Sequence, residues 1–193
     1  MPNFVVIGSG IAGLNFALQA SNLGKVLIIT KKKAVDASTN FAQGGIAGVM
    51  STLDSFDKHI EDTVIAGNQH NDKKAVEFMV RKAPEAIKNL IECGVKFANS
   101  DGEILLTREG GHSERRIAFV GDYTGKEIEE ALIKNVKKNK NIKILEHAFA
   151  VDILTDETNK EAKGVRIIKD KKILDIYGNY VILATGGFGQ VYE

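Results

Sequence analysis

A glycine pattern near the start of the chain has the residue types and spacing of a nucleotide-binding turn. Gly8, Gly10 and Gly13 form G-x-G-x-x-G between the apolar runs "FVVIG" and "LNFALQA". In a strand-to-helix turn, the first glycine permits a tight bend, the second lets the main chain approach a pyrophosphate, and the third allows helix and strand to pack closely. Because the helix N-terminus then offers N–H groups to phosphate oxygens, we predict a dinucleotide site here.

The residue that follows the second strand bears on which dinucleotide binds. NAD sites usually carry an acidic residue about 20 positions after the glycine pattern. This chain has Lys31 there, directly after "KVLIIT". A lysine could favour the 2′-phosphate of NADP, or it could contact a phosphate or ribose of FAD. The residues alone make NAD less favoured and leave NADP and FAD open.

Two further stretches combine residues that could bind small polar molecules. The segment "STNFAQGGIAGV" (38–49) has hydroxyl and amide side chains beside glycines that let the main chain come close to a ligand. The segment "TREGGHSERR" (107–116) has three arginines, two glutamates and a histidine. Arginine suits carboxylates and glutamate suits an ammonium group. Composition alone nevertheless favours a solvated loop with weak internal ion pairs for 107–116.

Apolar periodicity predicts the elements that must position these residues. "NFVVIG" and "KVLIIT" are typical of buried parallel strands, and with the helix between them they form a βαβ unit. Helices are expected over 54–69, over 72–93 and after "TGKE" at 124. "AVDIL", "AKGVRIIK" and "KILDIYG" predict a small antiparallel meander, and "NYVILATGG" predicts another buried strand. The fold class is therefore α/β, Rossmann-like, with a parallel sheet and a small antiparallel β-meander insertion.

Composition excludes several classes of protein. The net charge of +1 gives no global field for nucleic acid or for an anionic membrane, and no apolar run reaches the roughly 20 residues of a membrane span. The single cysteine, Cys93, cannot form an intrachain disulfide and suits a reducing compartment. We therefore expect a soluble, cytoplasmic protein. No cluster has metal-ligand spacing, and His59, His70 and His147 are interpreted as ordinary surface or helix-end histidines.

Taken together and in order, these motifs resemble a known flavoprotein family. The chain is similar to the flavoprotein family of succinate dehydrogenase and fumarate reductase, and most of all to the L-aspartate oxidase branch of that family. The resemblance is carried by "VVIGSGIAGLNFAL", "ITKK", "STNFAQGGIAGV", "LTREGGHSERR", "DYTGKEIEEAL" and "VILATGGFGQVY". The resemblance implies an FAD-binding, Rossmann-like domain over 1–193. It also implies oxidation of L-aspartate to iminoaspartate, with oxygen or fumarate as electron acceptor, as the first step of NAD biosynthesis by way of quinolinate.

Carried over position by position, the resemblance assigns the site residues. The implied FAD contacts are Gly8, Ser9, Gly10, Ile11, Ala12, Gly13, Lys31, Ser38, Thr39, Asn40, Phe41, Ala42, Gln43, Gly44, Gly45, Phe149, Ala150, Thr185 and Gly186. Glu109 is the implied substrate-binding residue, because it matches a glutamate that favours the amino group of aspartate over a plain dicarboxylate. Arg108, His112, Arg115 and Arg116 receive no assigned role.

The resemblance also bears on how FAD is held. Membrane-bound members of the family carry a histidine that bonds covalently to the flavin, and Ser38 stands at that position here. No histidine lies between Met1 and Lys58. We therefore predict noncovalent FAD.

Members of this family are more than twice as long as the present sequence. We expect the catalytic residues, a capping domain and a C-terminal helical domain to lie beyond Glu193, and the chain alone to be inactive. Three alternatives stay open: part of a soluble fumarate reductase or succinate dehydrogenase-like flavoprotein, a non-catalytic nucleotide-binding half of a split enzyme, and a generic NADP-binding domain. Quinolinate synthase, or a polypeptide that supplies the missing half, is the expected partner.

Overall fold

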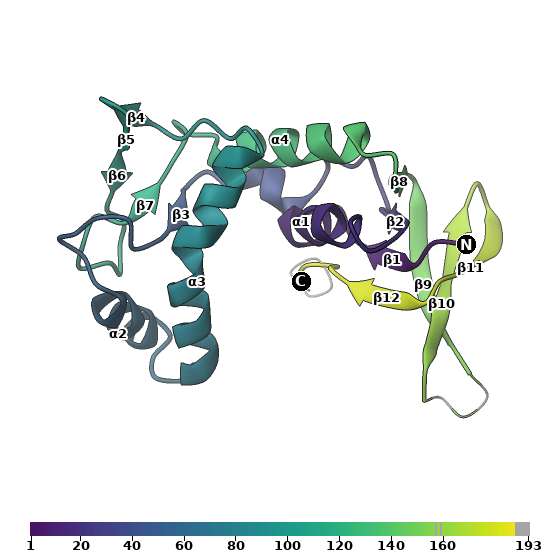
Figure 1. Cartoon of the computed structure of the whole chain (residues 1–193). Coiled ribbons are helices and arrows are strands. Elements are labelled where there is room, and N and C mark those ends of the chain that lie inside the picture. Colours follow the sequence, from purple (N-terminus) through teal and green to yellow (C-terminus); the bar gives the residue numbers. More distant parts are fainter. Residues whose placement is uncertain (157, 159, 188–193) are drawn as a thin grey trace. The chain divides into compact units, whose positions relative to one another are not determined.

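The chain divides into two compact units. The computed structural model describes residues 1–156, 158 and 160–187 (Figure 1). Unit 1 comprises Met1–Phe41 and Ile128–Glu193, and unit 2 comprises Ala42–Glu127. Within the described residues, no helix has both the length and the apolar character needed to cross a membrane.

A four-stranded parallel sheet forms the centre of unit 1. Its strands lie in the order β12 (Tyr180–Leu183), β1 (Phe4–Ile7), β2 (Val26–Ile29) and β8 (Ile142–Leu145). Phe4 lies opposite Tyr180 on one side and Val26 on the other. Valine and isoleucine predominate in these strands because both faces of the sheet are covered, as is usual for parallel sheets.

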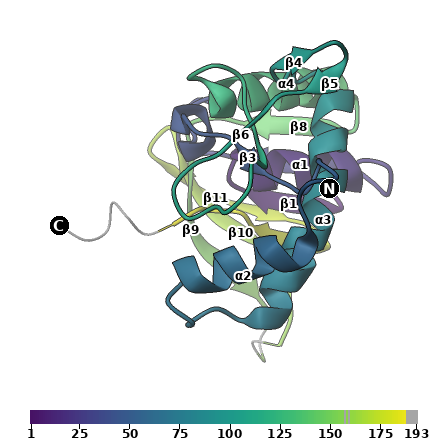
Figure 2. The ribbon, with the colours of Figure 1, turned by 90° about the vertical axis from the view of Figure 1, so that its left-hand side faces the viewer.

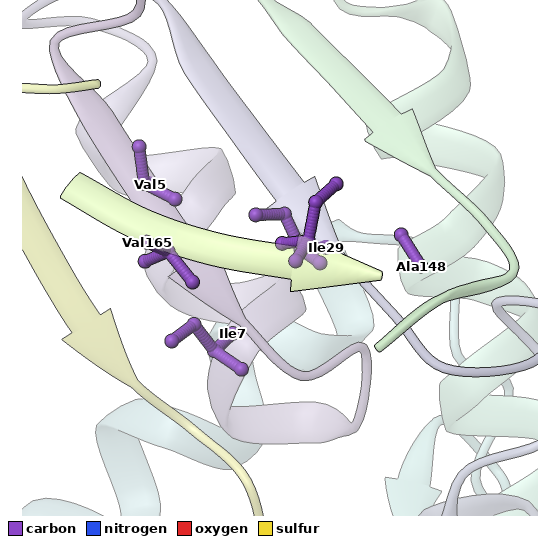
Figure 3. Close-up of a cluster of buried hydrophobic side chains, with 6 residues drawn as sticks. Val5, Ile7, Ile29, Ala148 and Val165 are labelled. Atoms are coloured by element: carbon purple, nitrogen blue, oxygen red, sulfur yellow. The ribbon is translucent and has the colours of Figure 1, made fainter. Parts of the chain in front are cut away.

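The two faces of this sheet are covered by different elements. Helix α1 (Ile11–Ala20) packs on β1 and β2. The antiparallel meander of β9 (Ala148–Thr155), β10 (Ala162–Lys169) and β11 (Lys172–Tyr177) packs on the opposite face. Figure 3 shows Val165 of β10 lying against Val5 and Ile7 of β1 and near Ile29 of β2. The predicted α/β class with a parallel sheet and a small antiparallel meander is confirmed.

Two further elements complete the described part of unit 1. A 3-10 turn, η1, spans Ser38–Phe41. Helix α4 runs over Thr124–Lys138, and its residues from Ile128 onward belong to unit 1. That part buries an apolar stripe of Ile128, Leu132, Ile133 and Val136 at helical spacing.

Unit 2 consists of two helices and very short strands. Helix α2 (Phe56–Ala66) lies beside α3 (Lys73–Glu92) in both views (Figures 1 and 2). The short strands are β3 (Ile46–Ala47), β7 (Ile117–Ala118) and β6 (Leu106–Thr107), in that order, with β4 (Asn99–Ser100) paired to β5 (Glu103–Ile104).

Both helices of unit 2 were predicted from periodicity. The predicted range 72–93 is one residue wider than α3 at each end, and 54–69 begins two residues before α2 and ends three residues after it. The Asp72 carboxylate accepts hydrogen bonds from the N–H groups of Lys74 and Ala75 and so caps α3. At the other end Gly94 has a φ of +99°, a left-handed conformation that glycine adopts without strain and that ends the helix. The two-residue strands were not predicted, because they are too short to show an alternating pattern.

Candidate functional site

The turn between β1 and α1 requires glycine for steric reasons. Gly8 has a φ of +116°, and a Cβ there would lie 2.1 Å from the carbonyl oxygen of Ala184. A Cβ on Gly13 would lie 2.1 Å from the carbonyl oxygen of Gly8. Both obstacles are main-chain atoms that cannot move aside. Gly10 precedes the first turn of α1 and makes no side-chain capping bond, so that turn suits an external acceptor such as phosphate.

Two hydroxyl groups stabilise this turn from within the protein. Thr39 Oγ1 accepts a hydrogen bond of 3.0 Å from the N–H of Ile11. The buried Ser9 hydroxyl donates to the carbonyl oxygen of Ala34 at 2.9 Å and lies 3.0 Å from Thr30 Oγ1. Because the Ser9 hydroxyl proton is already engaged, the main-chain N–H of Ser9 is the donor left for a cofactor, and the Thr39 hydroxyl holds the first turn of α1.

The structure brings Lys31 close to the predicted contacts on β9. Lys31 is exposed at the end of β2. The N–H of Ala148 donates to the carbonyl oxygen of Thr30 at 3.0 Å, and that of His147 donates to the carbonyl oxygen of Lys32 at 3.3 Å. The first residues of β9, including Phe149 and Ala150, therefore run beside the end of β2.

The predicted contacts after β12 lie beside the glycine turn. The N–H of Ala184 donates to the carbonyl oxygen of Ile7 at 2.9 Å, so Thr185 follows directly beyond the end of β1. Gly186 has a φ of +74°. The glycine turn, Lys31 and Thr185 thus come from the carboxyl ends of neighbouring parallel strands, which is the edge where open α/β sheets bind ligands.

A buried carboxyl group on α4 was not noticed in the sequence. Glu129 is fully buried, and within the described residues neither of its carboxyl oxygens has a hydrogen-bond partner. Burial raises the pKa of Glu129 to about 8, because the charged form would lose its hydration. Glu129 is therefore protonated in the folded protein at neutral pH.

In unit 2, the predicted substrate residue Glu109 lies against the second half of the 38–45 loop. A Cβ on Gly44 would lie 3.1 Å from Glu109 Oε1, so the carboxylate rests over the glycine main chain. A Cβ on Gly45 would lie 2.4 Å from the carbonyl oxygen of Ala118, which explains the glycine beside β7. The carbonyl oxygen of Ala42 accepts from the N–H of Gly125 at 2.9 Å. Each of these contacts joins the loop to other residues of unit 2.

The charged side chains of the 107–116 segment do not form one cluster. Glu109 lies at Gly44 and Arg116 is fully buried. Arg108 and Arg115 line an open cavity of about 780 Å³. The other residues lining this cavity are Met50–Asp54, Glu103–Leu106, Ser113 and Glu114. The structure therefore separates Glu109 from the two exposed arginines.

Sequence reasoning missed a buried ionic network around Arg116. Its guanidinium donates from Nε and Nη2 to both oxygens of Asp54, each at 2.8 Å, and from Nη1 to Asp62 Oδ2 at 2.5 Å. Burial alone would raise the pKa values of both aspartates. For Asp54, hydrogen bonds from Arg116 and Ser55 lower the pKa below its ordinary value, and for Asp62 those from Ser113 and Arg116 do so. The only available signal was an arginine immediately before the apolar residues "IAF".

His59, interpreted as an ordinary surface or helix-end histidine, lies in the first turn of α2 but is not on the surface. His59 is 3% exposed, and its ring centroid lies 5.7 Å from that of His112. Burial lowers the pKa of His59, and the charge of Arg116 adds to this effect. His70 and His147 are exposed, as predicted. Among the described residues, no group of histidine, cysteine and acidic side chains could hold a metal ion.

Comparison with known proteins places these features in a family. Residues 3–193 match the model of a family described as FAD binding domain. The chain is 43% identical to L-aspartate oxidase 2-b, chloroplastic, of Nicotiana tabacum, over 98% of the chain and 30% of that protein. It is 39% identical to the L-aspartate oxidase of Yersinia pestis, over 98% of the chain and 38% of that protein. The chain thus spans about a third of the length of these curated relatives.

Solved structures agree with this result. A FrdA variant of Escherichia coli quinol fumarate reductase superposes with a TM-score of 0.92 at 29% identity, over 99% of this chain and 33% of that one. The Sdh1 complex of Mycobacterium smegmatis in its apo form gives a TM-score of 0.90 at 28% identity, over 99% of this chain and 35% of that one.

Proposed function

Because the chain belongs to the FAD binding domain family, we propose that it is the FAD-binding portion of an L-aspartate oxidase. The reaction removes two electrons and two protons from the Cα–N bond of L-aspartate and yields iminoaspartate. FAD, when bound, supplies the electron acceptor for this step and is reoxidised by oxygen, giving hydrogen peroxide, or by fumarate, giving succinate. Residues 1–193 would form the FAD-binding domain of the longer enzyme.

The residues of unit 1 fit an FAD site. Gly8 and Gly13 allow the tight packing of the turn against neighbouring main chain, and Gly10 at the start of α1 has no side chain that could cap the N–H groups of the first turn. Lys31 is exposed at the end of β2, where it can contact the anionic or hydroxyl groups of the nucleotide half. Thr185 and Gly186 follow β12 at this edge of the parallel sheet. Phe149 and Ala150 lie in β9 of the antiparallel sheet, beside the end of β2, and all four residues are proposed as further contacts.

The observation that carries the proposed substrate is the position of Glu109. Its carboxylate lies over Gly44, in the loop for which the resemblance implies flavin contacts. A carboxylate there can accept hydrogen bonds from the ammonium group of aspartate, whereas it would repel a dicarboxylate without one. Glu109 is therefore proposed to bind and orient the amino group rather than to transfer a proton.

Changing Glu109→Gln in the holoenzyme that contains this chain tests the substrate. We expect aspartate-dependent peroxide formation to fall at least tenfold, because an amide lacks the charge that binds ammonium. Fumarate reduction with a reduced dye should be retained or should rise, because the repulsion between the Glu109 carboxylate and fumarate is removed. Glu103→Gln is the matched control, since Glu103 is an exposed carboxylate of the same unit. An equal loss of both activities in Glu109→Gln would contradict the assignment.

The similarity to fumarate reductases supports the second candidate, a soluble fumarate reductase-like flavoprotein. A wild-type holoenzyme that reduces fumarate but does not oxidise aspartate would establish this alternative. A protein with neither activity that copurifies with a complementary polypeptide would instead favour the non-catalytic half of a split enzyme.

The mode of FAD attachment has a direct test. Ser38 offers no imidazole to the flavin, so FAD is proposed to be noncovalent. Acid precipitation should leave all the flavin in the supernatant, and flavin retained by the precipitated polypeptide would overturn this proposal.

Two further proposals concern the surroundings of the enzyme. Iminoaspartate hydrolyses readily, so direct transfer to quinolinate synthase is proposed, and copurification of the two proteins tests it.

A cytoplasmic location is also proposed. Plant relatives are named chloroplastic, so fractionation of the native host is the relevant measurement.

A further inference from the structure

Arg116 holds a buried charge cluster together in unit 2. Its side chain and that of Asp54 are 0% and 1% exposed, and that of Asp62 is 14% exposed. The guanidinium is bidentate to Asp54 and donates a third bond to Asp62. We name these three residues the Arg116 clamp. A lysine could not reproduce this geometry, because its ammonium lacks the planar fork that matches a carboxylate.

The main-chain N–H and carbonyl groups of Arg116 are hydrogen-bonded as well as its side chain. Its N–H donates to the carbonyl oxygen of Thr107 at 3.1 Å, and its carbonyl oxygen accepts from the N–H of Gly48 at 2.9 Å. These bonds extend the pairing of β7 with β6 and β3. Arg116 therefore closes the base of the loop formed by residues 108–115.

Asp62 links this loop to α2. Its Oδ2 atom accepts from the N–H and from the hydroxyl of Ser113, each at 2.8 Å, as well as from Arg116. Three donors on one carboxylate oxygen tie residue 113 and residue 116 to the same point of the helix. The buried cluster thus acts on the loop itself and not only on its base.

Other restraints on the loop are weaker. Within the loop, the N–H of His112 donates to the carbonyl oxygen of Glu109 at 3.3 Å. A second ion pair from α2 joins Lys58 Nζ to Glu114 Oε1 at 2.6 Å, but the Lys58 side chain is 49% exposed. Exposed pairs contribute little, because water screens them and both side chains lose rotamer freedom. The Arg116 clamp is therefore the dominant attachment of the loop.

We propose that Arg116 is a positioning residue that, through Asp54 and Asp62, fixes the 108–115 loop on α2 and thereby holds the Glu109 carboxylate at Gly44. The role of Glu109 in binding the amino group rests on the proposed function. The attachment of the loop does not. Arg116 touches neither substrate nor cofactor in this proposal, and its effect reaches the substrate only through the position of Glu109.

The test uses Asp62→Asn and Arg116→Lys, with Lys58→Met as the control that breaks the exposed pair of the same helix and loop. Hydrogen exchange of the amides of residues 109–113 should become about tenfold faster in both clamp variants and stay unchanged in Lys58→Met, because each clamp variant loses a hydrogen bond to a charged group. Asp62→Asn preserves shape, so it keeps the test valid where Arg116→Lys fails to fold.

Steady-state kinetics of the holoenzyme give the second readout. The KM for aspartate should rise about tenfold in Asp62→Asn, with kcat and fumarate reduction nearly unchanged, since only the binding of the ammonium group by Glu109 is weakened. Wild-type exchange rates in a folded clamp variant would overturn the inference. Absence of aspartate oxidation by the wild-type enzyme would overturn the proposed function instead, and the exchange data would still decide whether the clamp fixes the loop.

Discussion

The carboxylate of Glu109 lies on the side of Gly44 where a side chain would project, so that a Cβ at position 44 would come within 3.1 Å of Oε1. This contact joins the loop rich in glycine and hydroxyl groups to the charged loop within unit 2. The absence of a side chain at Gly44 therefore leaves the space that the Glu109 carboxylate occupies.

Replacing Gly44→Ala should therefore displace Glu109 without unfolding the protein. The obstacle is the end of a flexible side chain, which can shift by a few tenths of an ångström. If Glu109 binds the amino group as proposed, we expect the KM for aspartate to rise about fivefold, because the carboxylate is displaced from its proposed position, while thermal stability changes little. Steady-state kinetics and a melting curve measure the two quantities. Gly110→Ala is the control, since a Cβ there meets no atom within 4 Å, and an identical KM in both variants would argue against the role of this contact.

Gly8→Ala, unlike Gly44→Ala, should destabilise the fold. The added Cβ meets the carbonyl oxygen of Ala184 at 2.1 Å, and the φ of +116° is strained for any other residue. We expect a loss of about 3 kcal/mol or more in the free energy of unfolding, because main chain must move to relieve the contact. Urea denaturation followed by circular dichroism measures it. Gly187→Ala, which meets no atom within 4 Å, serves for comparison. Equal denaturation midpoints for the two variants would show that the turn is not sterically constrained.

Lys31→Ala should weaken FAD binding rather than folding. Lys31 is exposed at the end of β2, so its removal leaves no buried group unpaired. We expect the Kd of FAD for the flavin-free protein to rise about fivefold at low salt and by less at high salt, as for a screened charge contact. Quenching of flavin fluorescence measures the Kd. Lys33→Ala provides the baseline, since Lys33 is also exposed and has no assigned contact. If both alanine variants bind FAD equally well, Lys31 is not a contact.

Glu129→Gln should change how stability depends on pH. The folded-state pKa of about 8 exceeds the ordinary carboxyl value of 4.5, so the folded protein retains a proton that the unfolded chain releases. The contribution of Glu129 is fully present below pH 4.5 and is lost as pH rises to 8, at up to about 1.4 kcal/mol per pH unit. Wild type and Glu129→Gln should therefore be similar near pH 5, and the variant should be more stable at pH 8.

Urea titrations at pH 5, 6.5 and 8 provide this measurement. Glu127→Gln is the matched control, because Glu127 is exposed in the first turn of the same helix and should leave the pH slope unchanged. Parallel pH profiles for wild type and Glu129→Gln would mean that a partner satisfies the Glu129 carboxylate in solution.

Some features of the fold follow from local sequence. The βαβ unit was predictable because buried parallel strands are continuous runs of valine and isoleucine and because the turn between strand and helix needs glycine. Helix α3 was predictable from its apolar spacing and from Asp72 and Gly94 at its ends. The strands β3 to β7 were not, since two residues cannot display a period of two.

The residues of the candidate site also divide into those that could be predicted from the sequence and those that could not. The glycine turn and Lys31 were proposed from residue type and spacing. Glu109 was proposed only from the family resemblance of "LTREGGHSERR", because composition alone favoured a solvated loop. The Arg116 clamp was not, although Arg108, Arg115 and Arg116 lie within nine residues of one another. Nothing in their local sequence distinguishes an arginine that lines a cavity from one that is fully buried.

By itself the sequence determined the family, the α/β class and the glycine turn between β1 and α1. The class and the turn follow from local sequence because steric limits at glycine and the burial of apolar side chains act over a few neighbouring residues. Only the tertiary structure decided which charged groups are buried. Asp54 and Arg116 are 62 positions apart, and the Glu129 carboxyl has no bonded partner within the described residues. The free energy of a charged side chain depends on the solvent and on the partners that the folded chain brings to it, and those are set by contacts between distant segments.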